Sequence, residues 1–248
     1  MSGDAGSAPD LVLRYADHAC GLLDLHLPGG AMPEAPAPVV LLVHGGFWRS
    51  AWDRTHTRPQ ARALADLGHV VVTPEYRRVG PGDDRDGAGG GWPTTGDDVR
   101  RALAALPAAL PWALVRTTAV GHSAGGHLVL WLAATGAPLD HVVALAPVCD
   151  LREALRLDLG DGAAAALLAG ADPADADPMT LLDERPQGTV AVVHGTRDDA
   201  VPVTLSRALA ARHPWISCTE VDADHMALID PTSSAWPVVV RALAAHDI

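Results

Sequence analysis

The chain has 248 residues and a mass of 25.7 kDa, and 48% of it is hydrophobic, so it is long enough for one well-filled globular domain and too apolar to be disordered over most of its length. Its 18 basic and 30 acidic residues give a formal net charge of −12, which, without a basic patch, disfavours nucleic acid and anionic membrane surfaces as partners. No window approaches about 18 consecutive apolar residues, which argues against a membrane span.

Residues 1–35 form an N-terminal segment, and its first ten residues, MSGDAGSAPD, show neither the basic nor the apolar region of a secretory signal. A stretch rich in proline, alanine and glycine spans residues 28–38, overlaps the end of that segment, and indicates an exposed connection. The cysteines are odd in number and lack metal-ligand spacing: Cys20, Cys149 and Cys218. We therefore expect reduced, mostly buried thiols in a cytoplasmic protein.

The rest of the chain alternates between two patterns. Strand-length apolar runs occur at 39–43, 69–76, 117–121, 141–146, 189–194 and 216–221, and helical patterns at 58–67, 95–109, 124–135, 203–212 and 235–246. Strands that are apolar throughout and separated by helices indicate a parallel sheet covered on both faces. The predicted fold class is therefore α/β, a doubly wound and mostly parallel sheet.

Two segments interrupt this alternation. Residues 79–93 are rich in glycine and aspartate and indicate a flexible surface excursion. Residues 151–187 contain helical patches at 151–157 and 161–169. This insertion is too small for a large cap domain, but it is long enough to wall one side of a pocket. We expect a single domain over residues 1–248.

Polar residues gather where the predicted strands end. His44 to Trp48 follow the strand that ends at Val43, and Ser123 follows the strand that ends near Gly121. Asp150, the run HGTRDD and the run DADH follow the next three strands. Since functional groups in parallel α/β sheets gather at the carboxyl ends of the strands, we expect the site there.

Ser123 stands in the run GHSAGG between a strand and a helix, and two interpretations are open. It can be a helix N-cap, since serine is a favoured cap and glycine is common in tight turns. It can also be a nucleophile on a strained turn, with glycines on either side because side chains there would collide with neighbouring elements.

A serine nucleophile needs a base and an acid to orient that base. His225, after the last strand, is the candidate base, and Asp198, four residues after His194, is the candidate acid. For Asp199, a solvated neighbour or a cap is the alternative, and for Asp150 a cap of the helix at 151–157. The chain order serine, acid, histidine is that of one hydrolase superfamily and not of the two best-known serine-protease groups.

The histidines give no sign of a metal site. No HExxH spacing occurs, and His122 and His127 are five residues apart, so they do not share a helix face. The run GHSAGG also lacks the dinucleotide pattern GxGxxG. We expect no metal and no cofactor.

These motifs resemble the α/β-hydrolase superfamily, specifically its small carboxylesterase and kynurenine-formamidase-like branch. The resemblance rests on HGGFW at 44–48, EYRR at 75–78, WPTTGDDV at 92–99, the GHSAGG turn, HGTRDDAVP at 194–202 and DADH at 222–225. It implies an oxyanion hole made by the backbone amides of Gly46, Phe47 and Ala124. It also implies that Trp48 and His122 belong to the substrate-binding region, although His44, His122 and His194 have structural interpretations too.

The sequence thus predicts a cofactor-independent serine hydrolase that cleaves a small carboxylic ester or amide through an acyl-enzyme. Arylformamidase activity on N-formylkynurenine and acyl transfer to an acceptor other than water stay open, as does a non-catalytic binding protein on this fold. The partner expected is a small-molecule substrate. A homodimer through the apolar face of residues 235–246 is a further alternative.

Overall fold

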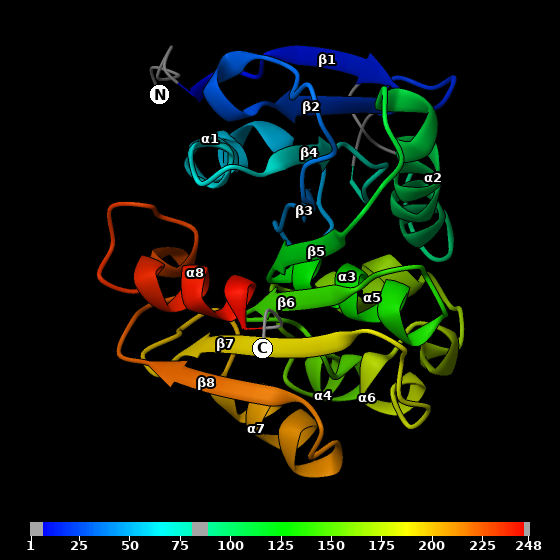
Figure 1. Cartoon of the computed structure of the whole chain (residues 1–248). Helices are drawn as coiled ribbons and strands as arrows, with labels where there is room; N and C mark the ends of the chain where they lie inside the picture. Colours follow the sequence, from blue (N-terminus) through cyan, green and yellow to red (C-terminus); the bar gives the residue numbers. More distant parts are fainter. Residues whose placement is uncertain (1–6, 81–88, 246–248) are drawn as a thin grey trace.

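The structure is a computed structural model that describes residues 7–80 and 89–245. In these residues the backbone forms an eight-stranded sheet (Figure 1). Its strands are β1 (Leu11–Arg14), β2 (Leu22–His26), β3 (Val39–Val43), β4 (Val70–Pro74), β5 (Thr117–His122), β6 (His141–Leu145), β7 (Thr189–Gly195) and β8 (Ser217–Val221).

The strand order is β1-β2-β4-β3-β5-β6-β7-β8. The six neighbouring strands β4, β3, β5, β6, β7 and β8 pair in parallel. β1 pairs antiparallel to β2, and β2 pairs antiparallel to β4. Every residue of β3, β4, β5 and β6 is buried, because helices cover both faces of a parallel sheet. The predicted doubly wound, mostly parallel α/β class is confirmed.

Helices lie on both faces of the sheet (Figure 1). One face packs against α1 (Arg58–Asp66) and α8 (Trp236–Ala244). The other packs against α2 (Thr94–Ala109), α3 (Ala124–Ala134), α4 (Leu151–Arg156), α5 (Ala163–Leu168), α6 (Pro178–Leu181) and α7 (Val203–Arg212). Short 3₁₀ helices lie at Pro28–Gly30, Arg54–Thr57, Pro173–Asp175 and Met226–Leu228. None of the described helices is long and apolar enough to cross a bilayer.

The N-terminal segment differs from the sequence expectation, because it contributes two strands to the sheet. β1 is mostly exposed and short, and β2 carries Asp24, whose side chain is fully buried between Arg54 and Arg58. A charged residue in a short run does not predict a buried strand, so the pattern alone left β2 out. Of the predicted excursion at 79–93, residues 81–88 lie outside the described residues.

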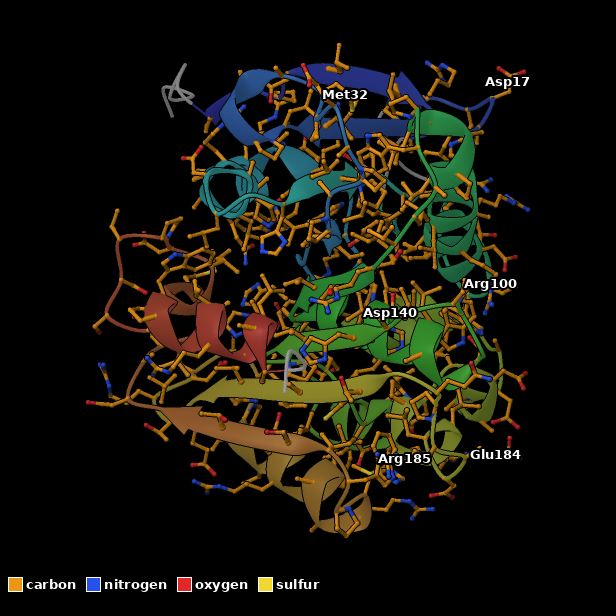
Figure 2. All side chains as sticks on the ribbon, viewed as in Figure 1. Asp17, Met32, Arg100, Asp140, Glu184 and Arg185 are labelled. Carbon is orange, nitrogen blue, oxygen red and sulfur yellow. The ribbon has the colours of Figure 1, made fainter. Side chains whose placement is uncertain are left out.

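The two edges of the parallel sheet differ in what they carry. A hollow of about 950 Å³ lies at the amino ends of β5, β6 and β7, and Asp140, Glu184 and Arg185 are among its lining residues (Figure 2). None of the predicted site residues lines it. The carboxyl ends of β3, β5, β7 and β8 lead instead into the loops that hold those residues.

Candidate active site

Ser123 occupies a sharp turn between β5 and α3, with φ of 56° and ψ of −116°. Left-handed backbone of this kind is rare for residues other than glycine and marks a strained turn. A Cβ at Gly121 would come within 2.2 Å of the Gly125 carbonyl oxygen, and a Cβ at Gly125 within 2.1 Å of the Val43 carbonyl oxygen. The glycines are therefore required by close backbone packing between β3, β5 and α3.

The interpretation of Ser123 as a residue whose side chain caps the helix is wrong. Ser123 stands at the N-cap position of α3, but its side chain makes no capping hydrogen bond. Its backbone holds the turn instead, since its amide donates to the Leu145 carbonyl oxygen at 2.8 Å and its carbonyl accepts from the Val148 amide at 3.2 Å. The hydroxyl, in a residue that is 2% exposed, is thus left for another use.

Asp198 and His225 lie in contact at the ends of β7 and β8. His225 Nδ1 is 2.6 Å from Asp198 Oδ2, and the Asp198 side chain is fully buried. Asp198 Oδ1 accepts from the amides of Ala200 and Val201 at 2.9 and 2.8 Å. Burial alone would raise the pKa of Asp198, but hydrogen bonds from His194 and His225 and from the Val201 amide hold that pKa well below its ordinary value. The carboxylate is therefore charged and fixed in place.

Two neighbouring acids have other surroundings. Asp199 is exposed, and the carboxylate that meets His225 is that of Asp198. Asp150 accepts from the Glu153 amide at 2.8 Å, so it caps α4 as its alternative interpretation predicted. His194 is also buried, and its Nδ1 faces the Ser206 hydroxyl while its Nε2 faces the Val201 carbonyl oxygen. It therefore stabilises the loop after β7, which carries Asp198.

His122 joins the nucleophile turn to the base. It directly precedes Ser123, its Nε2 lies 3.0 Å from the His225 carbonyl oxygen, and the two imidazole centroids are 4.4 Å apart. Burial and the proximity of His225 lower the pKa of His122 well below its ordinary value, so the ring is neutral and Nε2 donates to that carbonyl. The structure thus brings His225 and Asp198 into contact and, through His122, places the turn that carries Ser123 beside His225. In the described residues the Ser123 hydroxyl has no hydrogen-bond partner, and such nucleophile–base bonds are commonly long until substrate is bound.

The loop after β3 lies against the nucleophile. A Cβ at Gly45 would come within 3.2 Å of Ser123 Cβ, and Gly46, Phe47 and Trp48 all have positive φ, at 105°, 51° and 55°. Within the described residues the amides of Gly46, Phe47 and Ala124 donate to no protein acceptor. Unpaired amides beside a serine turn are what an oxyanion hole requires.

Trp48 and His122, expected in the substrate-binding region, are both buried. Trp48 is 1% exposed and packs edge-on against His127 with 5.2 Å between ring centroids. His122 is 3% exposed and turned toward His225. These positions favour support of the site over direct contact with a ligand. Trp52 is instead 47% exposed, and its Cβ lies against Gly46.

The described residues hold no group of three or more histidine, cysteine, aspartate or glutamate side chains arranged to bind a metal ion.

Comparison with protein families finds one match, to the family described as BD-FAE, over residues 23–150, which is just over half of the chain. The chain belongs to the BD-FAE family. That family is of the α/β-hydrolase type, so the resemblance seen in the sequence is confirmed. The matched span contains His44 to Trp48 and Ser123, whereas Asp198 and His225 lie beyond it.

Solved structures share the fold of this BD-FAE chain at low identity. Esterase B from Lactobacillus rhamnosis is 20% identical, with a TM-score of 0.78 over 97% of this chain and 86% of that one. The Est2 esterase from Thermogutta terrifontis is 21% identical, with a TM-score of 0.72 over 95% and 90%. A truncated carbohydrate esterase from gut microbiota is 16% identical, with a TM-score of 0.77 over all of both chains. No curated protein sequence matches.

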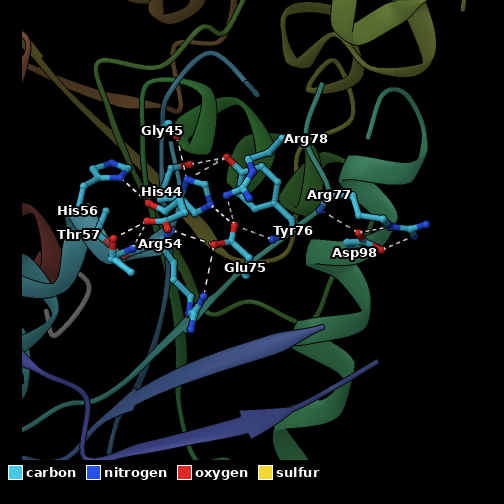
Figure 3. A network of polar contacts seen from close by, with 12 residues as sticks. His44, Gly45, Arg54, His56, Thr57, Glu75, Tyr76, Arg77, Arg78 and Asp98 are labelled. Atoms are coloured by element: carbon cyan, nitrogen blue, oxygen red, sulfur yellow. Dashed lines mark hydrogen bonds and ion pairs between the residues drawn. The ribbon is translucent and has the colours of Figure 1, made fainter. Parts of the chain in front are cut away.

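One feature of this BD-FAE site is not predicted by the sequence motifs, a buried ionic network behind the loop after β3 (Figure 3). It joins His44 through Glu75 to Arg54 and Arg78. The run EYRR was noted only as part of the resemblance. The signal available was a glutamate directly after a wholly buried strand, which must find cationic partners when it is itself buried.

Proposed function

We propose that the chain is a serine hydrolase that cleaves a small carboxylic ester through a covalent acyl-enzyme. The observation that carries the proposal is the fully buried Asp198 carboxylate 2.6 Å from His225 Nδ1. His225 packs against His122, which precedes a serine on a strained turn whose hydroxyl caps nothing. Membership of the BD-FAE family and the esterase fold of the structural neighbours support the same conclusion.

In acylation, Ser123 Oγ adds to the ester carbonyl carbon while its proton passes to His225 Nε2. Asp198 holds Nδ1–H of His225, which keeps Nε2 free as an acceptor and stabilises the imidazolium that forms. The negative charge that develops on the carbonyl oxygen is met by the amides of Gly46, Phe47 and Ala124.

The tetrahedral intermediate collapses when the carbon–oxygen bond to the leaving group breaks and His225 returns the proton to that alkoxide. Water then repeats the sequence: it adds to the acyl carbon, gives its proton to His225, and expels Ser123 Oγ, which recovers the proton. The short helices α4, α5 and α6 between β6 and β7 form no large cap, which supports small acyl esters as substrates.

The test is the hydrolysis of p-nitrophenyl acetate by the wild type, by Ser123→Ala and by Ser217→Ala, an exposed serine on β8 that serves as the control. The proposal predicts an initial burst of p-nitrophenol that matches the enzyme concentration in the wild type and in the control. It predicts no burst from a folded Ser123→Ala. Turnover by Ser123→Ala within tenfold of the wild type would overturn the proposal.

A further inference from the structure

The loop that carries the proposed oxyanion hole adopts a strained backbone. Gly46, Phe47 and Trp48 follow one another at positive φ, and for residues other than glycine this conformation costs on the order of 1–3 kcal/mol each. Such a conformation persists only where neighbouring structure holds it. The C-terminal end of the loop is held because Trp48 is buried and its carbonyl oxygen accepts from the Val79 amide at 2.7 Å. The N-terminal end of the loop, which follows β3, depends on His44 and Gly45.

His44 holds the N-terminal end of the loop through both of its ring nitrogens. Its ring is fully buried, with Nδ1 2.8 Å from the Gly45 carbonyl oxygen and Nε2 3.0 Å from Glu75 Oε1. Tyr76 stacks on it at 4.2 Å and donates its hydroxyl to the His44 carbonyl oxygen at 2.9 Å. Because a peptide group is planar and trans, a Gly45 carbonyl directed at His44 turns the Gly46 N–H to the opposite side. The orientation of that amide is therefore set by the His44 ring.

Glu75 in turn fixes the His44 ring (Figure 3). Its Oε1 meets His44 Nε2 and an Arg78 Nη1, and it also accepts from the Tyr76 amide at 3.2 Å. Its Oε2 accepts from the Arg54 amide at 3.1 Å and lies 3.5 Å from Arg54 Nη1. Burial opposes the charge of Glu75, but His44 and Arg78 outweigh it and lower the pKa of this carboxyl to about 2.

We propose that Glu75 is a positioning residue for the hydrolysis, acting through His44 to hold the Gly46 amide in the orientation that receives the oxyanion. The inference rests on the proposed function. Glu75 touches no reacting atom, so its loss should weaken only the interaction made with the developing negative charge.

The experiment compares Glu75→Gln with Asp98→Asn. Asp98 is the matched control, because it is also a fully buried carboxylate, held by Arg77 at 2.8 and 2.7 Å, yet none of its contacts is with His44 or the loop. Two quantities are measured: kcat/KM for p-nitrophenyl acetate, corrected for the active fraction given by the burst, and the inhibition constant of 1,1,1-trifluoro-2-butanone. The trifluoroketone takes up Ser123 Oγ to form a tetrahedral oxyanion.

We expect Glu75→Gln to lower corrected kcat/KM by about 10- to 100-fold, below the 10²–10³ cost of losing a donor outright. The inhibition constant of the trifluoroketone should rise by a similar factor, because both complexes carry the oxyanion. Asp98→Asn should change neither by more than about twofold. Partial unfolding would lower the active fraction and leave the inhibition constant unchanged, so it is separable from this effect.

A folded Glu75→Gln protein with both quantities within twofold of the wild type would overturn the inference, as would equal losses in Asp98→Asn. If Glu75→Gln does not fold, Tyr76→Phe decides, since it removes only the hydroxyl that donates to the His44 carbonyl. In Tyr76→Phe, corrected kcat/KM should fall and the inhibition constant of the trifluoroketone should rise, each by about three- to tenfold. A Tyr76→Phe protein in which neither quantity changes would overturn the inference. A wild type with neither a burst nor ester turnover would instead contradict the proposed function.

Discussion

Replacing Asp198 by asparagine tests the assignment of the acid with the least change in shape. In the wild type Oδ1 accepts from the amides of Ala200 and Val201, and Oδ2 accepts from His225 and lies 3.3 Å from His194 Nε2. Asparagine has one acceptor oxygen and one donor group. If its oxygen keeps the two amides, its NH2 faces His225 Nδ1, which must then lose its proton to accept. The proton moves to Nε2, and the base can no longer take the proton of Ser123.

This wrong tautomer should lower kcat by about 10⁴, the cost known for the corresponding change in another serine hydrolase. Asp199→Asn is the matched control, because Asp199 is adjacent and exposed, and its kcat should stay within about twofold. The assay is p-nitrophenyl acetate hydrolysis at 25 °C, with the fold checked by circular dichroism. A folded Asp198→Asn protein within tenfold of the wild type, or an equal loss in Asp199→Asn, would refute the assignment.

Three further predictions follow from the same geometry. Gly125→Ala should lower the free energy of unfolding in urea by more than about 3 kcal/mol, because its Cβ would stand 2.1 Å from the Val43 carbonyl oxygen; a loss under 1 kcal/mol would show that the turn yields. The pKa of Glu75 is lowered from 4.5 to about 2, so the stability that its charge contributes is present above pH 4.5 and is lost as the pH falls toward 2. In urea titrations between these pH values, the free energy of unfolding of the wild type should fall by on the order of 2–3 kcal/mol more than that of Glu75→Gln. Equal losses in the two proteins would contradict this prediction. Dialysis against EDTA should leave ester turnover unchanged, since the proposed reaction uses only groups of the chain, and a loss restored by a divalent ion would contradict it.

The central strands of the parallel sheet could be predicted because they are built around apolar runs, whereas β8 is mixed in composition and mostly exposed. The run at 39–43 coincides with β3, and the run at 141–146 ends one residue beyond β6. Helices α2 and α7 also begin within one residue of the positions that the periodicity indicates. These elements are specified locally, by burial on both faces of a strand or on one face of a helix.

The parts that sequence reasoning missed depend on distant partners. Asp24 is buried in β2 only because Arg54 and Arg58 reach it from about thirty residues away in the chain. Glu75 in the same way draws on His44 and Arg54. The alternation of strands and helices along the chain predicts which residues lie at the carboxyl ends of the strands. It does not predict which charged side chains form buried ion pairs with residues far away in the sequence.

The substrate-binding residues were the least predictable part of the site. Trp48 was expected there from its motif, yet it packs in the core, and the exposed aromatic beside Gly46 is Trp52. Which of two nearby tryptophans faces solvent depends on the positive φ values at Phe47 and Trp48, and a sequence pattern does not encode these.

The proposed reaction requires that Ser123 be a nucleophile activated by His225. Incubation of the folded chain with a fluorophosphonate, followed by peptide mapping of the mass shift, tests this requirement directly. We expect a single modified serine, Ser123, and loss of that modification in a folded His225→Ala variant. An unmodified Ser123 in folded wild type, or equal modification with and without His225, would contradict it.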